Sequence, residues 1–142
     1  MLFLGLVAPT VLFSQKRPVG KWEGTLTNGL HSQSGQRFEL FLEIKGKVVR
    51  GKTFIYNEND EATAMDIEGT LYDDRSIYFE EVRPSAGQST DPVYTRKYQL
   101  LFTRSIWDST LDGYWQEIHV SPLDQKRKMG KIVMKKAAGS KA

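Results

Sequence analysis

The chain has 142 residues, of which 20 are Lys or Arg and 17 are Asp or Glu, and it contains no Cys. This length and charge balance are those of one domain, and 39% hydrophobic residues provide enough apolar surface for one core, which excludes a disordered or collagen-like chain. The absence of Cys excludes disulfides, thiolate metal sites and cysteine nucleophiles.

Residues 1–14 are uncharged and almost wholly apolar, and the sequence turns polar at Gln15. The run is too short to span a bilayer core of about 30 Å. With Leu12 and Ser14 as a cleavage site, it predicts an export signal and a secreted or periplasmic protein, although no basic residue precedes the run. The alternative is a buried first strand or a short core helix. No later stretch is long and apolar enough to predict a membrane span.

From Val19 onward, apolar residues recur at every second position in short runs separated by Gly, Asp, Asn, Ser and Pro. This is the period of half-buried strands, and no window shows the spacing and caps of a helix. The predicted strands cover residues 20–27, 37–45, 48–56, 63–72, 76–82, 94–103, 110–119 and 129–136. We expect residues 15–136 to form one domain and residues 137–142 a flexible tail.

Several glycines fall on, or just before, the apolar faces of these predicted strands. They are Gly24, Gly51, Gly69, Gly113 and Gly130. Interior glycines let a sheet coil tightly enough to close, and closure removes exposed edges. We therefore predict an all-β fold, an eight-stranded antiparallel up-and-down (meander) barrel of lipocalin-like type, with a β-sandwich as the alternative.

The opening strand, with Gly20, Trp22 and Gly24, resembles the Gly-x-Trp strand of the calycin superfamily, which comprises lipocalins, fatty-acid-binding proteins and avidins. A second Gly-x-Trp occurs at residues 113–115, and residues 130–135 resemble the short final strand of such barrels. The resemblance implies a barrel that binds ligands in its mouth, and a structural role for Gly20, Trp22 and Gly24 as the plug of the closed end. The chain departs from the calycins in having no helix after the last strand, no helical lid, and no Ser, Asp and Asn run of a biotin site.

Loop length indicates where the mouth of the predicted barrel lies. Alternate connections of a meander barrel lie at the same end, and those after the odd-numbered strands are longer on the whole. A period of two carries Glu81 inward with Phe79, and Glu117 inward with Trp115, so both carboxylates point inward near this mouth. An inward carboxylate is a candidate polar anchor for a ligand, and the alternative is that each strand simply ends in water there.

The candidate ligand-binding residues of the rim and cavity are His31, Glu81, Tyr98, Trp115, Glu117 and His119. His119 shares a strand face with Trp115 and Glu117, whereas His31 is read more simply as a solvated loop histidine. A metal site built from the two histidines and the two glutamates is conceivable, but loop spacing does not establish that they converge, so no metal is predicted. The chain has no nucleophile elbow, His-Glu-x-x-His motif or phosphate loop, so neither catalysis nor a cofactor is predicted.

The end of the chain is basic, with seven Lys or Arg residues against one acid from Ser121 onward. Such a segment is suited to an acidic surface or a protein partner, and the ordinary alternative is a solvated outer strand face. Basic residues without interleaved aromatics are a weak signal for nucleic acid, so no nucleic-acid partner is expected.

These observations favour two functions, with an enzyme as the third. The first is an exported small barrel that binds a small, partly apolar ligand at its long-loop mouth, with no span of the membrane. The second is a solid-cored extracytoplasmic interaction protein that acts through its loops or its basic last strand. Large inward residues such as Phe38, Phe79 and Phe102 support the second function, because small barrels can be filled completely by side chains.

Overall fold

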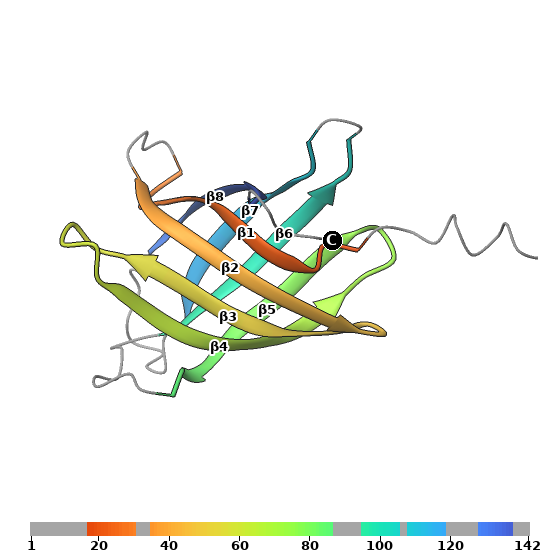
Figure 1. The fold of residues 1–142 in the computed structure, drawn as a ribbon, viewed down its shortest axis with the longest axis horizontal. Helices are drawn as coiled ribbons and strands as arrows, with labels where there is room; N and C mark the ends of the chain where they lie inside the picture. Colours follow the sequence, from red (N-terminus) through yellow and green to blue (C-terminus); the bar gives the residue numbers. More distant parts are fainter. Residues whose placement is uncertain (1–16, 31–34, 87–94, 106–107, 119–127, 138–142) are drawn as a thin grey trace, which may run out of the picture.

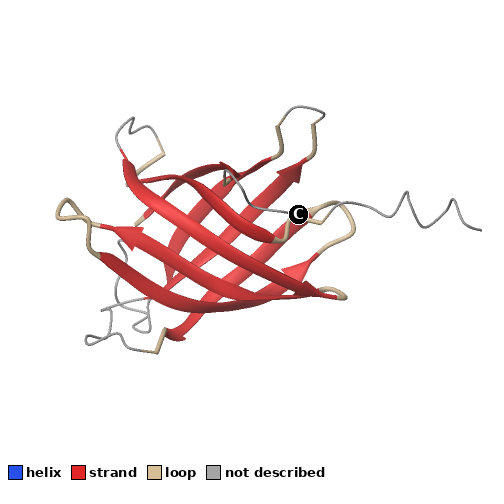
Figure 2. Ribbon diagram, viewed as in Figure 1, coloured by secondary structure: helices blue, strands red, loops and turns tan. Residues whose placement is uncertain are grey.

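The computed structural model describes residues 17–30, 35–86, 95–105, 108–118 and 128–137. Eight strands form a closed antiparallel barrel in which each strand pairs with the next along the chain, and the last pairs with the first (Figures 1 and 2). The strands are β1 (Gly20–Thr27), β2 (Gly35–Lys45), β3 (Val48–Tyr56), β4 (Ala62–Leu71), β5 (Ser76–Pro84), β6 (Thr95–Thr103), β7 (Thr110–Ile118) and β8 (Met129–Lys136). The predicted meander barrel is confirmed.

The strand limits match the predicted ones at β1, β3 and β8 and differ by one or two residues at the other strands. The largest differences are at β2, which begins at Gly35, and at β5, which continues to Pro84. A proline is expected to end a strand before it, but Pro84 is tolerated here because it is the last residue of β5. The extension of β5 follows a register shift between Asp66 and Ile67 of β4, beyond which Arg83 and Pro84 still pair with β4.

The interior glycines lie where neighbouring strands approach closely. A Cβ atom on Gly24 would lie 1.8 Å from the Val133 carbonyl oxygen, and one on Gly51 would lie 1.7 Å from that of Phe41. Gly69, Gly113 and Gly130 face backbone oxygens at 1.9, 2.0 and 1.8 Å in the same way. Any side chain at these positions would push the strands apart, so the glycines permit the tight coiling that closes the barrel.

The interior of the barrel is filled by side chains at mid-height. The largest fully buried residues are Trp22, Trp115, Tyr98, Phe38, Phe79, Leu26, Leu40, Leu42, Met65, Ile67, Ile77 and Leu100. The Tyr98 ring stacks on Phe79, with centroids 4.7 Å apart, and lies 5.8 Å from the Phe38 ring. Burial of this much aromatic and aliphatic surface is the main stabilising contribution to the fold.

The two ends of the barrel are built differently. At the short-hairpin end lie the β2–β3, β4–β5 and β6–β7 connections, and at the long-loop end lie the four connections that follow the odd-numbered strands. Ala137 is buried and its N–H donates to the Lys21 carbonyl oxygen at 3.0 Å. The predicted signal segment and residues 138–142 of the predicted tail lie outside the described residues. Within the described part of the chain, no helix is long and apolar enough to cross a membrane.

Candidate functional site

A group of polar side chains points into the barrel at the long-loop end. We call it the inner polar cluster, and its members are Thr53 of β3, Glu81 of β5, Arg96 and Tyr98 of β6, and Glu117 of β7. Each shares the inward face of its strand with buried apolar residues two positions away. The same alternation that builds the core therefore carries ionisable groups inward at one end.

Glu81 is the centre of this cluster, with only 4% of its surface exposed. Its carboxylate accepts a hydrogen bond from the Tyr98 hydroxyl at 2.7 Å and one from the Arg96 backbone N–H at 2.9 Å. The hydroxyl of Thr53, itself fully buried, donates to the carboxylate at 3.4 Å. A buried carboxylate needs such donors, because its transfer out of water is costly.

Burial changes the protonation of both central groups. It raises the pKa of Glu81 above its ordinary value, while the Tyr98 hydroxyl and the positive charge of Arg96 act in the opposite direction. Burial, followed by the negative charge of Glu81, raises the pKa of Tyr98 well above its ordinary value. Tyr98 therefore keeps its proton at neutral pH and remains a hydrogen-bond donor. The Glu81 carboxylate takes up a proton more readily than an exposed glutamate does.

The second carboxylate and an indole complete the cluster. Glu117 is 2% exposed, accepts a hydrogen bond from the Lys128 backbone N–H at 3.2 Å and pairs with Arg96 in the β6–β7 register. The Arg96 guanidinium lies 5.1 Å from the centroid of the Trp115 ring, whose N–H donates to the Thr27 carbonyl oxygen at 2.8 Å. One guanidinium, two carboxylates and an aromatic face thus meet at the long-loop end.

The structure brings together four of the predicted site residues, Glu81, Tyr98, Trp115 and Glu117. Both glutamates are buried, so their strands do not end in water at these positions. His31 and His119, the two predicted rim histidines, lie outside the described residues. In the described part of the chain, no group of three His, Asp or Glu side chains is arranged to hold a metal ion.

Arg96 and Thr53 are members of the cluster that the sequence analysis did not select. The period of two could have placed Arg96 on the inward face of β6, because Tyr98, Leu100 and Phe102 are buried on that face. The signal for Thr53 is its position between Gly51 and the buried Ile55. Neither residue type is unusual in a strand, so only the convergence with Glu81 identifies them.

Trp22 lies at the opposite, short-hairpin end with 1% of its surface exposed. Its ring meets Phe102 edge to face at a centroid distance of 5.9 Å, and its N–H donates to the Pro18 carbonyl oxygen at 3.1 Å. Gly20 begins β1 with a φ of 97°, and Gly24 provides the close approach to β8 described above. This is the position that the calycin resemblance implied, and the role of plug stays a prediction.

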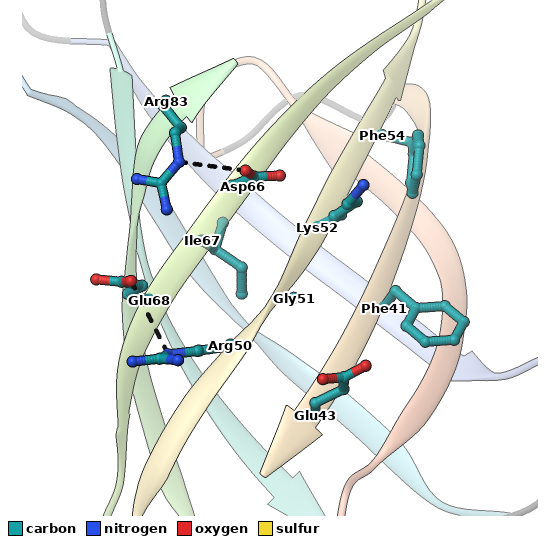
Figure 3. Close-up of a pocket in the computed structure, with 10 residues that line it drawn as sticks. All are labelled: Phe41, Glu43, Arg50, Gly51, Lys52, Phe54, Asp66, Ile67, Glu68 and Arg83. Atoms are coloured by element: carbon teal, nitrogen blue, oxygen red, sulfur yellow. Dashed lines mark ion pairs between the residues drawn. The ribbon is translucent and has the colours of Figure 1, made fainter. Parts of the chain in front are cut away.

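A groove of about 500 Å³ lies on the outer face of β2–β5 (Figure 3). Phe41 and Phe54 line one side of it. Two ion pairs line the other side: Arg83 lies 3.4 Å from Asp66, and Arg50 lies 3.9 Å from Glu68. Four of the charged side chains that line the groove therefore already pair with one another at an exposed surface.

No family model and no curated protein matches the chain. Among solved structures, a low-affinity mutant of shwanavidin matches it with a TM-score of 0.64 at 12% identity, over 88% of this chain and 98% of that one. The complex of this mutant with biotin matches with a TM-score of 0.60 at 12% identity, over 87% of this chain and 100% of that one. The complex of short afifavidin with biotin matches with a TM-score of 0.54 at 15% identity, over 82% of this chain and 86% of that one. The calycin resemblance is thus confirmed for the fold alone: the chain forms an eight-stranded barrel like those of shwanavidin and afifavidin.

Proposed function

We propose that this protein binds a small ligand at the long-loop end of the barrel, against the inner polar cluster. The observation that carries the proposal is the burial of Glu81 and Glu117 on the inward faces of β5 and β7, with the partly buried Arg96 on β6 between them. Apolar residues at these positions would extend the core at less desolvation cost. Buried ionisable groups with shifted pKa values, gathered at one end of a scaffold, are characteristic of binding sites.

The proposed ligand is small and partly apolar, with a polar head. The buried Trp115 ring gives the cluster an aromatic wall, and Arg96 and the two glutamates contribute a guanidinium donor and carboxylate acceptors. Support also comes from the fold, because shwanavidin and afifavidin share it and have been solved in complex with biotin. Biotin is therefore one compound to test, together with a wider pool of metabolites, because the chain lacks the Ser, Asp and Asn run of a biotin site.

Native mass spectrometry of the gently purified protein is the first experiment. The expected result is a discrete mass excess that disappears on denaturation, either as purified or after incubation with biotin or a lipid and metabolite extract. Tryptophan fluorescence should respond to the same compound. A bare protein mass, together with fluorescence that responds to none of these pools, would overturn the proposal.

A pair of matched tyrosine variants places the ligand at the cluster. Tyr98→Phe keeps the ring stacked on Phe79 but removes the hydroxyl that donates to Glu81, and we expect it to weaken binding by about tenfold. Tyr78→Phe is the control, because Tyr78 makes a similar bond to Glu80 away from the cluster. Equal binding by the two variants would place the ligand elsewhere.

We also propose that the protein is exported, with residues 1–14 as the signal. The support is the uncharged, apolar composition of this segment, followed by a polar sequence from Gln15. Expression of the full chain and fractionation of the cells should place the protein outside the cytoplasm, with a measured mass that begins near Gln15. An intact mass in the cytoplasmic fraction would contradict export.

The filled interior favours a second candidate function, association through the outer surface. Phe38, Phe79 and Tyr98 occupy the middle of the barrel, so a ligand has space only toward the loops. The outer face of β8 exposes Lys131, Val133 and Lys135, which suits an acidic protein or surface. Salt-sensitive association with an acidic partner that persists in Trp115→Ala would favour this candidate over the first.

A further inference from the structure

A second pocket, of about 310 Å³, lies at the short-hairpin end, away from the inner polar cluster. Four segments that are distant in sequence form it: residues 17–18, the β2–β3 hairpin, the β4–β5 hairpin and the end of β6. Apolar contacts come from Pro18, Leu71 and Phe102. Cationic side chains come from the first three of these segments, with Arg17, Lys47 and Arg75 among the lining residues.

The acids near this pocket are already engaged. Lys47 forms an ion pair with Asp73 at 3.1 Å. Asp74 accepts hydrogen bonds from the backbone N–H of Ser76 at 2.9 Å and from its hydroxyl at 2.6 Å. Arg17 donates to the Gly46 carbonyl oxygen at 2.8 Å. Within the described residues, neither Arg17 nor Arg75 forms an ion pair with a carboxylate, so their guanidinium charges dominate the pocket.

Arg75 occupies a backbone conformation that an arginine rarely adopts. Its φ is 72°, in the left-handed region where the closing residue of such a hairpin is usually glycine. The turn is held by bonds from the Arg75 N–H to the Tyr72 carbonyl at 3.0 Å and from the Phe102 N–H to the Arg75 carbonyl at 3.1 Å. A residue that costs turn stability but brings a guanidinium to a pocket indicates a function for that side chain.

We propose that this pocket binds a phosphate monoester with a small apolar body. Guanidinium groups pair with phosphate oxygens through two parallel hydrogen bonds, and Arg17 and Arg75 supply two such groups from different segments. Pro18, Leu71 and Phe102 provide the surface for the apolar body. The site is independent of the ligand proposed for the long-loop end.

The test is a titration of the ¹⁵N-labelled protein with phenyl phosphate, followed by amide chemical shifts. The expected result is saturable shifts confined to residues 17–18, 46–47, 71–75 and 102. Vesicles containing phosphatidic acid show whether the natural ligand is a lipid headgroup or a soluble ester. If the pocket binds a lipid headgroup, the vesicles should compete with phenyl phosphate. If it binds soluble esters only, the vesicles should leave the phenyl phosphate titration unchanged. Absence of saturable shifts at these residues would overturn the proposal.

Substitution of Arg75 separates the two consequences of its conformation. Arg75→Gly should raise the midpoint of thermal unfolding by about 4 °C, because glycine suits the left-handed turn, and should weaken phenyl phosphate binding by about tenfold. Arg75→Asn keeps a residue that tolerates this conformation and should lose binding equally. Arg83→Gln removes the same charge from the outer groove and should bind as the native protein does. Native binding by Arg75→Gly, or equal loss in Arg83→Gln, would overturn the proposed site.

Discussion

The two ends of the barrel use the same arrangement around a tryptophan. At the short-hairpin end, the Trp22 N–H donates to the Pro18 carbonyl oxygen, and the Lys136 ammonium lies 5.0 Å from the ring centroid. At the long-loop end, the Trp115 N–H donates to the Thr27 carbonyl oxygen, and the Arg96 guanidinium lies 5.1 Å from the ring. Each indole therefore has its polar atom satisfied and a cation near its face.

The surroundings of the two rings differ. Trp22 packs against Phe102, whereas Trp115 lies beside a group that includes the buried Glu81 and Glu117. Apolar packing stabilises the fold, and buried carboxylates cost free energy that a binding function can justify. The two ends therefore differ in what surrounds the indole: an aromatic ring at the short-hairpin end, and buried carboxylates at the long-loop end, where we propose that a ligand binds.

The largest effect is expected for Trp22→Ala. Loss of a fully buried indole should reduce the free energy of unfolding by about 4 kcal/mol, measured by urea denaturation. Ligand binding by the remaining folded protein should be unchanged, whereas Trp115→Ala should lower both stability and binding. A loss below about 1 kcal/mol in Trp22→Ala would contradict the structural role of this end.

Glu81→Ala should cost about 3 kcal/mol in the same measurement. It opens a space in the barrel and leaves the Tyr98 hydroxyl and the Arg96 N–H without their carboxylate acceptor. The matched control is Glu80→Ala on the opposite face of β5, which should change stability by less than about 1 kcal/mol. Similar losses in both variants would show that the cluster is not energetically distinct from the surface.

The pH dependence of stability provides a test of the buried carboxyl group. Because burial raises the pKa of Glu81 in the folded state, the folded protein binds this proton more tightly than the unfolded chain, so ionisation destabilises the fold as the pH rises above about 4.5. Glu81→Gln cannot ionise, and it should gain stability relative to the native protein over that range. Urea denaturation between pH 4 and pH 8 measures the difference, and a constant difference across the range would contradict the raised pKa.

Tyr98→Phe should reduce the free energy of unfolding by about 1.5 kcal/mol, because the Glu81 carboxylate loses a donor in a buried position. Tyr78→Phe, which removes a half-buried hydroxyl bonded to Glu80, should cost only about 0.5 kcal/mol. Parallel urea denaturation of the two variants gives the comparison. The reverse order would indicate that the outer pair is the stronger one.

Apart from the control variants, the smallest effect is expected for Lys136→Met, which keeps most of the side-chain packing on Trp22 and removes the charge. The cation over an indole, together with the bond from Lys136 to the Val19 carbonyl, should contribute about 1 kcal/mol. Thermal unfolding would detect this as a fall of a few degrees in midpoint. A fall as large as that of Trp22→Ala would mean that the charge, and not the packing, stabilises this end.

The fold was predictable from the sequence because its signals are local. Alternation along each run identifies the strand and its inward face, and it gives the limits of β1, β3 and β8 without error. The interior glycines mark the positions where strands approach one another, and they favoured a barrel over a sandwich before any contact was known. The end of β5 was not predicted correctly, because the register shift at Asp66 of β4 lets β5 continue to Pro84.

The chemistry at the two ends was only partly predictable. The sequence by itself determined that Glu81, Tyr98, Trp115 and Glu117 lie on inward faces, because side-chain direction follows a period of two. Only the tertiary structure decided that the Glu81 carboxylate meets donors from β3 and β6, and that Arg17, Lys47 and Arg75 line one pocket. The physical reason is that strand period is a property of neighbouring residues, whereas convergence depends on closure and register across strands that are distant in the chain.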